Sequence, residues 1–148
     1  MVTVERRIPV GRPAEEVLRY LADFAHTAEW DPGTVRCVRT GTGPVTEGSR
    51  WTNTSRFRGR TTQLEYRLVR RDAERLLFVG ENRTVTAIDD ITVRPAAGGG
   101  AVVDYRAQLR FKGMARLAAP FLKGAFEDLA DGVAARLPQV LAAPVADR

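Results

Sequence analysis

Few side chains in this sequence have the chemistry of an acid, base, nucleophile or metal ligand. The chain of 148 residues contains one histidine, His26, and one cysteine, Cys37. Zinc and non-haem iron need several ligands at close spacing, and the sequence offers no such cluster. Its serines are Ser49 and Ser55, and neither lies in the Gly-x-Ser-x-Gly motif of a serine hydrolase. We therefore expect no metal site and no other cofactor.

His26 lies in the segment FAHTAEWDPGTV, residues 24–35, together with Trp30 and Asp31. In a functional interpretation, His26 is a general acid or base at the edge of a cavity. In a structural interpretation, Asp-Pro-Gly is a turn capped by the Asp31 side chain, and Trp30 fills the core beneath it. His26 then lies near a helix C-terminus. No orienting partner for His26 can be identified, so the structural interpretation is favoured.

An antiparallel sheet is predicted from the alternation of apolar and polar residues. Residues 3–10 alternate in this way. A short helix then begins at Pro13 and ends before the Asp-Pro-Gly turn. Six further segments rich in Val, Thr, Ile, Phe and Tyr follow, separated by turn sequences: 34–40, 49–58, 61–71, 76–82, 84–95 and 101–111.

A long helix is predicted over residues 114–141, with Pro120 as either a kink or the true start. Its apolar stripe includes Met114, Leu117, Phe121, Leu129, Val133 and Leu137. The sheet buries one face, and this helix is the element large enough to cover it. A cavity is therefore expected between the two, where a ligand would bind.

Strand alternation also predicts which side chains face that cavity. Trp51 and Phe57 share a strand face with Asn53 and Ser55, so this face is inward. Buried polar groups need hydrogen-bond partners, or a ligand that supplies them. The same reasoning on the other strands and on the long helix gives the expected ligand-binding residues, each with the alternative of an ordinary core role: Trp51, Asn53, Ser55, Tyr66, Phe78, Tyr105 and Phe121.

Two charged residues interrupt these apolar faces. Asp89 faces inward if Ala87 and Ile91 do, and an isolated inward carboxyl group has a raised pKa and can donate a proton. Arg6 interrupts the first strand, where it either extends out of the core at a strand end or offers a buried cation to an acidic ligand; we favour the first. The candidate catalytic residues are therefore Tyr66, Tyr105, Asp89 and His26.

The charge balance bears on partners and compartment. The net charge is +5, but 21 of the 23 basic residues are arginines, a bias that we attribute to codon usage, so nucleic acid is an unlikely partner. The arginines between residues 56 and 75 are expected on the solvated sheet face, or alternatively on a surface for an anionic partner. No apolar run is long enough for a membrane helix, and the first ten residues do not resemble an export signal. With its single cysteine, the chain is expected to be cytoplasmic.

Residues 8–51, IPVGRPAEEVLRYLADFAHTAEWDPGTVRCVRTGTGPVTEGSRW, resemble the opening of the START-like helix-grip superfamily (SRPBCC), in particular its polyketide cyclase/dehydrase-like branch. The resemblance depends on a Pro-x-Glu-x-Val helix start, an LADF helix end, a Trp-x-Pro corner and a Gly-x-x-Trp strand start. Residues 91–121 are similar to the last hairpin of that family and the start of its long helix. The match extends over nearly the whole chain.

The resemblance implies an α+β helix-grip fold, formed by residues 1–148 as a single domain. A curved antiparallel sheet of about seven strands wraps around a long C-terminal helix, with one or two short helices after the first strand. The implied function is the binding or carrying of a small, largely hydrophobic or aromatic ligand. One alternative is a polyketide cyclase or dehydratase that uses the same cavity. Another is an adaptor that binds a partner through the Arg-rich outer sheet. The oligomeric state stays open, with a homodimer as one possibility.

Overall fold

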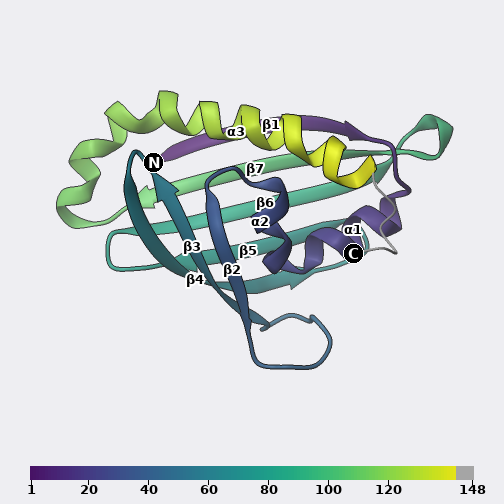
Figure 1. Ribbon diagram of the computed structural model, residues 1–148, viewed down its shortest axis with the longest axis horizontal. Coiled ribbons are helices and arrows are strands. Elements are labelled where there is room, and N and C mark those ends of the chain that lie inside the picture. The colour runs from purple at the N-terminus through teal and green to yellow at the C-terminus, as the bar shows by residue number, and fades with distance from the viewer. Residues whose placement is uncertain (143–148) are drawn as a thin grey trace.

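The computed structural model describes residues 1–142, which form one antiparallel sheet and a long helix (Figure 1). The seven strands lie in the order β1-β7-β6-β5-β4-β3-β2, and α3 lies along the sheet beside β1. This architecture confirms the predicted helix-grip fold. The strands are β1 (Val2–Val10), β2 (Thr34–Thr40), β3 (Arg50–Phe57), β4 (Arg60–Arg71), β5 (Arg75–Glu81), β6 (Val85–Pro95) and β7 (Ala101–Phe111). The helices are α1 (Ala14–Ala22), η1 (Phe24–His26), α2 (Thr27–Trp30), η2 (Ala97–Gly99), η3 (Gly113–Ala118) and α3 (Ala119–Ala142).

The strands agree with the predicted segments to within one or two residues because their turns are encoded locally. The β3–β4 hairpin is the tightest of these turns, with Phe57 paired to Arg60. Its two central residues, Arg58 and Gly59, have φ angles of 52° and 78°. Two consecutive positive φ angles are typical of a hairpin turn whose twist matches that of the flanking strands. The turn therefore fixes which side chains of β3 and β4 face α3.

The corner between α2 and β2 is the turn that the sequence predicted. Asp31 Oδ1 accepts a hydrogen bond from the backbone N–H of Gly33 at 2.9 Å, and the Trp30 side chain is buried. α3 passes close to this corner at Gly132, where an added Cβ atom would lie 2.6 Å from the Pro32 side chain. Gly132 therefore allows the helix to pack against the corner.

The start and orientation of α3 correct the sequence prediction. The α-helix begins at Ala119, so Pro120 lies in its first turn, while residues 113–118 form the 3₁₀ helix η3. A 3₁₀ helix has about three residues per turn, so the α-helical period extrapolated through this segment loses its phase. As a result Met114 and Leu117 are 81% and 68% exposed. Phe121 lies within α3 itself, about 100° around the helix from the cavity residue Leu122, and is 78% exposed. The later part of the predicted stripe is confirmed, since Leu129, Val133 and Leu137 face the sheet. Three residues that were not predicted join them: Leu122, Phe126 and Ala130.

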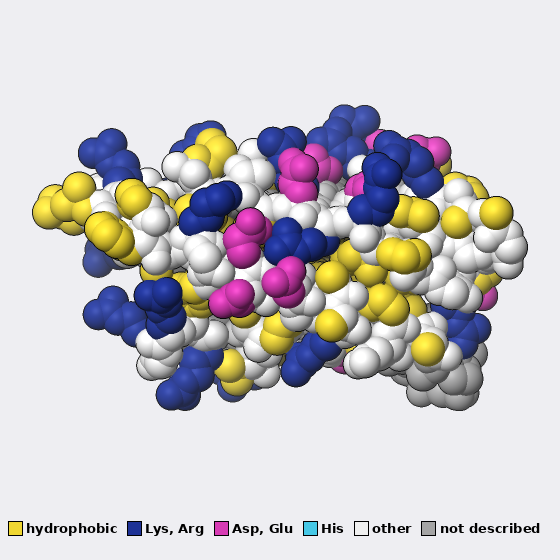
Figure 2. Space-filling model, turned by 90° about the horizontal axis from the view of Figure 1, so that it is seen from above, with side chains coloured by type: hydrophobic (Ala, Val, Ile, Leu, Met, Phe, Trp, Pro, Cys, Tyr) yellow, Lys and Arg dark blue, Asp and Glu magenta, His cyan; other side chains and the backbone are white. Residues whose placement is uncertain are grey.

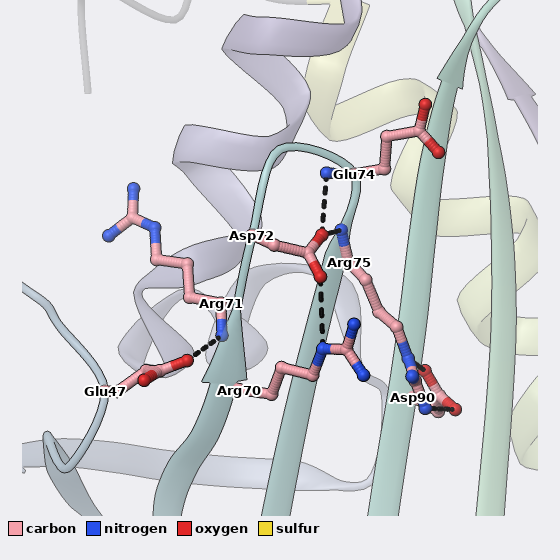
Figure 3. Close-up of polar contacts among 7 residues, drawn as sticks. All are labelled: Glu47, Arg70, Arg71, Asp72, Glu74, Arg75 and Asp90. Atoms are coloured by element: carbon pink, nitrogen blue, oxygen red, sulfur yellow. Dashed lines mark hydrogen bonds and ion pairs between the residues drawn. The ribbon is translucent and has the colours of Figure 1, made fainter.

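Several arginines of the outer sheet are held by intramolecular contacts near the β4–β5 turn (Figure 3). Asp72 accepts hydrogen bonds from the Arg70 side chain and from the backbone N–H groups of Glu74 and Arg75. The Arg75 guanidinium donates two hydrogen bonds of 2.8 Å to Asp90. These contacts stabilise the turn and occupy part of the charge that an adaptor surface would use.

Within residues 1–142, none of the helices is long and apolar enough to cross a membrane.

Candidate functional site

A cavity of about 240 Å³ lies between the inner face of the sheet and α3, where the sequence predicted a ligand site. Residues of β3, β4, β6 and β7, with Val4 of β1, form one wall, and residues 122–133 of α3 form the other. Most of its surface is apolar, with five polar side chains in the walls away from the rim: Asp31, Ser55, Tyr66, Asp89 and Tyr105. The cavity is therefore an apolar chamber with a small group of polar side chains.

The mouth of the cavity lies where the β3–β4 hairpin and the β5–β6 turn approach α3. Arg60 and Thr84 line the cavity here and are exposed to solvent. The Phe57 ring of the hairpin stacks on the Phe126 ring of α3, with centroids 4.5 Å apart and planes 4° from parallel. This aromatic pair joins the two walls at the rim, so a ligand would enter past it.

Asp89 is the most unusual side chain of the cavity. It lies on β6 between the inward residues Ala87 and Ile91, as the alternation predicted, and it is 8% exposed. None of residues 1–142 donates a hydrogen bond to its carboxyl group or forms an ion pair with it. Burial, with a smaller contribution from the nearby charge of Asp31, raises the pKa of Asp89 to about 8. At neutral pH the group is therefore mostly a protonated acid that can donate a hydrogen bond.

Tyr66 and Tyr105 place two hydroxyl groups beside this acid. The Tyr66 ring packs on Phe24 with centroids 4.4 Å apart, and the Tyr105 ring meets Trp30 edge-on at 5.9 Å. Neither hydroxyl forms a hydrogen bond within residues 1–142. Burial raises the pKa of both hydroxyls well above 10, and the charge of Asp89 raises it further. Both groups are therefore neutral at physiological pH and available to a ligand.

Gly80 explains how the Tyr66 ring reaches its place. An added Cβ atom at Gly80 would lie 2.6 Å from three atoms of that ring. Only a residue without a side chain allows the ring to lie over β5 at this position. The glycine is therefore part of the support of the cavity, although the sequence alone gave no reason to single it out.

Asp31 is a cavity residue that sequence reasoning assigned to the turn alone. Its Oδ2 atom accepts a hydrogen bond from the Thr34 hydroxyl at 3.0 Å, while Oδ1 caps Gly33. Burial raises the pKa of Asp31, and these two hydrogen bonds oppose the increase. The turn accounts for the residue type, so no separate sequence signal marked its second position on the cavity wall.

Within residues 1–142, no three His, Cys, Asp or Glu side chains gather as metal ligands would.

The other expected ligand-binding residues occupy different layers around the cavity. Ser55 lines it and donates a hydrogen bond of 2.6 Å to Asn53 Oδ1. Asn53 lies behind the wall, where its amide donates to the hydroxyls of Thr27 and Thr34. Trp51 and Phe78 are fully buried in the core against each other and do not line the cavity. Their rings therefore support the wall from behind.

Three further predicted residues lie outside the cavity. The His26 ring stacks on Tyr20 with centroids 4.3 Å apart, and its Nδ1 lies 2.6 Å from the Tyr20 carbonyl oxygen. Arg6 joins β1 to α3 through ion pairs of 3.2 Å with Glu127 and 2.9 Å with Asp131. Phe121, expected to bind ligand, projects into solvent instead, because it lies about 100° around α3 from Leu122, which faces the cavity. The charge of Arg6 is thus paired with two carboxylates of α3 and is not offered to the cavity.

Comparison with known families gives one match that spans nearly the whole chain. A family model described as "Polyketide cyclase / dehydrase and lipid transport" matches residues 1–140. No curated protein matches the chain.

Several solved structures share the fold. A START superfamily protein from Mycobacterium smegmatis is 11% identical, with a TM-score of 0.79 over 95% of this chain and 97% of that chain. The Zhui aromatase/cyclase from Streptomyces sp. R1128 is 12% identical, with a TM-score of 0.74 over 99% of this chain and 94% of that one. The di-domain aromatase/cyclase StfQ of the steffimycin biosynthetic pathway is 16% identical, with a TM-score of 0.70 over 99% and 52%. At these identities the likeness shows the fold alone.

Proposed function

The chain belongs to the polyketide cyclase/dehydrase and lipid transport family, and from that premise we propose that its cavity binds a small, mostly apolar molecule with a hydrogen-bond acceptor. The observation that carries the proposal is the group formed by Asp89, Tyr66 and Tyr105, whose polar atoms face an apolar cavity without partners among the described residues. Buried polar groups are normally hydrogen-bonded. A bound ligand with a carbonyl or hydroxyl group would supply the missing bonds.

The size of the cavity limits the ligand. An apolar cavity of about 150 Å³ holds one benzene molecule. The cavity here is about 240 Å³, which suits one or two rings. A longer molecule would extend through the mouth between the β3–β4 hairpin and α3. The proposed ligand class is therefore a one- or two-ring molecule, or the cyclic end of a longer chain.

The protonation state of the polar groups limits the chemistry of the ligand. A protonated Asp89 and two neutral tyrosines can all donate hydrogen bonds. Three donors in an apolar chamber favour a ligand carbonyl oxygen, which accepts up to two hydrogen bonds. A carboxylate ligand is disfavoured, because at higher pH it would lie near the charge of Asp89 and near Asp31.

Calorimetry with α-tetralone tests this proposal, with tetralin as the matched probe that lacks the carbonyl group. We expect α-tetralone to bind more tightly by about 0.5–1.5 kcal/mol for each hydrogen bond formed. Ala107→Leu extends a side chain into the cavity and should abolish binding of both probes, whereas Ala73→Leu on the exposed β4–β5 turn should not. Equal affinity for the two probes, or full binding by Ala107→Leu, would contradict the proposal.

A second candidate function is catalysis of ring closure or dehydration in the same cavity. Its specific support is the Asp89 pKa of about 8, because a general acid or base works best with a pKa near the operating pH. In a dehydration, the ionised fraction of Asp89 would take a proton from the carbon next to the ligand carbonyl and then give this proton to the leaving hydroxyl group. A double bond forms, water is released, and Asp89 returns to its starting state.

The dehydration of β-hydroxy-α-tetralone to α-naphthol provides a fluorescent assay for this activity. If Asp89 transfers the proton, Asp89→Asn should lower turnover by about 10²–10⁴-fold, with a much smaller change in α-tetralone affinity. Asp90→Asn, on the outer face of the same strand, is the matched control and should retain the rate. Absence of turnover in the unmodified protein would leave binding alone as the proposed function.

A further inference from the structure

The end of the molecule that carries the cavity mouth also carries an unusual surface. Met114 and Leu117 of η3 and Phe121 of α3 are 81%, 68% and 78% exposed. We refer to these three residues as the apolar tip. Figure 2 shows hydrophobic side chains projecting at this end, on the left, with Lys and Arg side chains around them. The tip is a projection, so it offers no groove for a ligand or a peptide.

Six exposed basic residues surround the tip, and we refer to them as the basic collar. They come from the β3–β4 hairpin, the β5–β6 turn, the end of β7, η3 and the start of α3: Arg58, Arg60, Arg83, Arg110, Arg116 and Lys123. None of the six forms an ion pair within residues 1–142. Seven other basic residues, among them Arg6 and Arg75, do form ion pairs. The collar is thus a cluster of basic side chains without acidic partners, next to the tip.

The acidic residues of this end do not cancel the collar. The segments 56–62, 81–86 and 109–124, which form this end, contain eight Arg or Lys residues and one acidic residue, Glu81. Glu81 is already paired with Lys112 at 2.9 Å. Since the whole chain has a net charge of only +5, the remainder of the molecule is slightly negative. The charge distribution is therefore polarised toward the cavity mouth.

We propose that this end docks on an anionic lipid membrane surface, with the apolar tip inserted among the headgroups and the collar against the anionic lipids. Clusters of four to eight Lys or Arg beside an apolar segment are typical of binding to such surfaces. An acidic protein would satisfy the same charges. A fluid lipid surface accepts a projecting tip without a complementary hollow, whereas a protein partner must supply one, and this favours the membrane.

Docking in this orientation would place the cavity mouth at the lipid surface. Leu122 and Phe126, which line the cavity, follow Phe121 within two turns of α3. An apolar ligand could then pass between bilayer and cavity with little exposure to water. This consequence for ligand exchange rests on the proposed function, whereas the docking itself does not.

Sedimentation with lipid vesicles tests the docking. The full-length protein is mixed with vesicles of phosphatidylcholine alone or with about 30% phosphatidylserine. We expect binding to the anionic vesicles only, weakened by salt. A collar variant combines Arg110→Gln, Arg116→Gln and Lys123→Gln. Its matched control removes three exposed charges elsewhere: Arg19→Gln, Arg36→Gln and Arg50→Gln. The collar variant should lose about fivefold in affinity for each charge removed, and the control much less.

A tip variant, Leu117→Gln with Phe121→Gln, should lose at least tenfold in vesicle affinity. Its matched control, Val38→Gln with Val69→Gln, changes two exposed apolar residues on strands and should bind as the unmodified protein does. All four variants should bind α-tetralone normally, which separates this test from that of the cavity. Equal losses in the collar variant and its control would overturn the proposal. The proposal would also be overturned if the protein bound soluble polyglutamate through the tip but did not bind vesicles. A dimer of the unmodified protein that is absent in the tip variant would overturn it as well.

Discussion

Replacing Asp89 by Asn should make the protein more stable, and by more as the pH rises. Asp89 is 8% exposed, and its carboxyl group accepts no hydrogen bond from the described residues and has a folded-state pKa of about 8 against an ordinary value of 3.8. Between these two pH values the folded protein retains a proton that the unfolded chain has released. The free energy of unfolding therefore falls as the pH increases.

The size of the effect follows from the pKa values. Each pH unit in this range removes about 1.4 kcal/mol from the free energy of unfolding. The stabilisation is fully present below pH 3.8 and is lost as the pH rises through about 8. Asn has nearly the same shape and cannot ionise. The variant should therefore be more stable by about 2 kcal/mol near pH 5 and by roughly 6 kcal/mol above pH 8, apart from a constant offset.

Urea unfolding of both proteins at several pH values measures this difference. The matched control is Asp90→Asn, because Asp90 is the next residue and accepts two hydrogen bonds from Arg75 on the outer face (Figure 3). This control should be less stable than the unmodified protein, by up to about 1 kcal/mol, because it loses an ion pair. A difference between Asp89→Asn and the unmodified protein that stays constant with pH would refute the reasoning.

Four further predictions concern the cavity, the residues that support it and His26. Tyr66→Phe and Tyr105→Phe should each weaken α-tetralone binding by about 0.5–1.5 kcal/mol in calorimetry if the cavity only binds, and a rate loss without an affinity loss would indicate catalysis instead. Gly80→Ala should displace the Tyr66 ring, and a tenfold loss of probe affinity with an intact circular dichroism spectrum would check this. Trp30→Ala should cost about 3–5 kcal/mol in urea unfolding through the void that it leaves. His26→Ala should retain α-tetralone affinity within a few-fold, and complete loss of binding in a folded variant would restore the functional interpretation of that histidine.

Strand residues could be placed from the sequence because their rules are local. The period of two residues per repeat, together with turns such as Arg58-Gly59, fixed the inward side of β3, β6 and β7. Asp89 and Tyr105 were placed on the inner face for this reason. Phe78 was also inward, but only the packing of β5 against Phe24 decides that its ring lies in the core rather than on the cavity wall.

Contacts between distant segments could not be predicted in the same way. The ion pairs of Arg6 with α3 join residues more than 120 positions apart, so the strand pattern showed only that an arginine interrupted the face. The 3₁₀ helix before Ala119 moved Met114 and Leu117 out of the predicted stripe, and only the packing of α3 shows that Phe121 lies off its buried face. Asp31 was assigned only to its turn, because a turn cap already explained it. Each of these cases depends on tertiary packing.

The central claim is that a ligand binds between the sheet and α3, and nuclear Overhauser effects between α-tetralone and the protein test it most directly. The methyl groups of Ala107 and Val133 line opposite walls of the cavity. The account predicts cross-peaks from the α-tetralone ring protons to both of these methyl groups. Cross-peaks confined to Met114 and Leu117 at the apolar tip, or none to either wall, would contradict it.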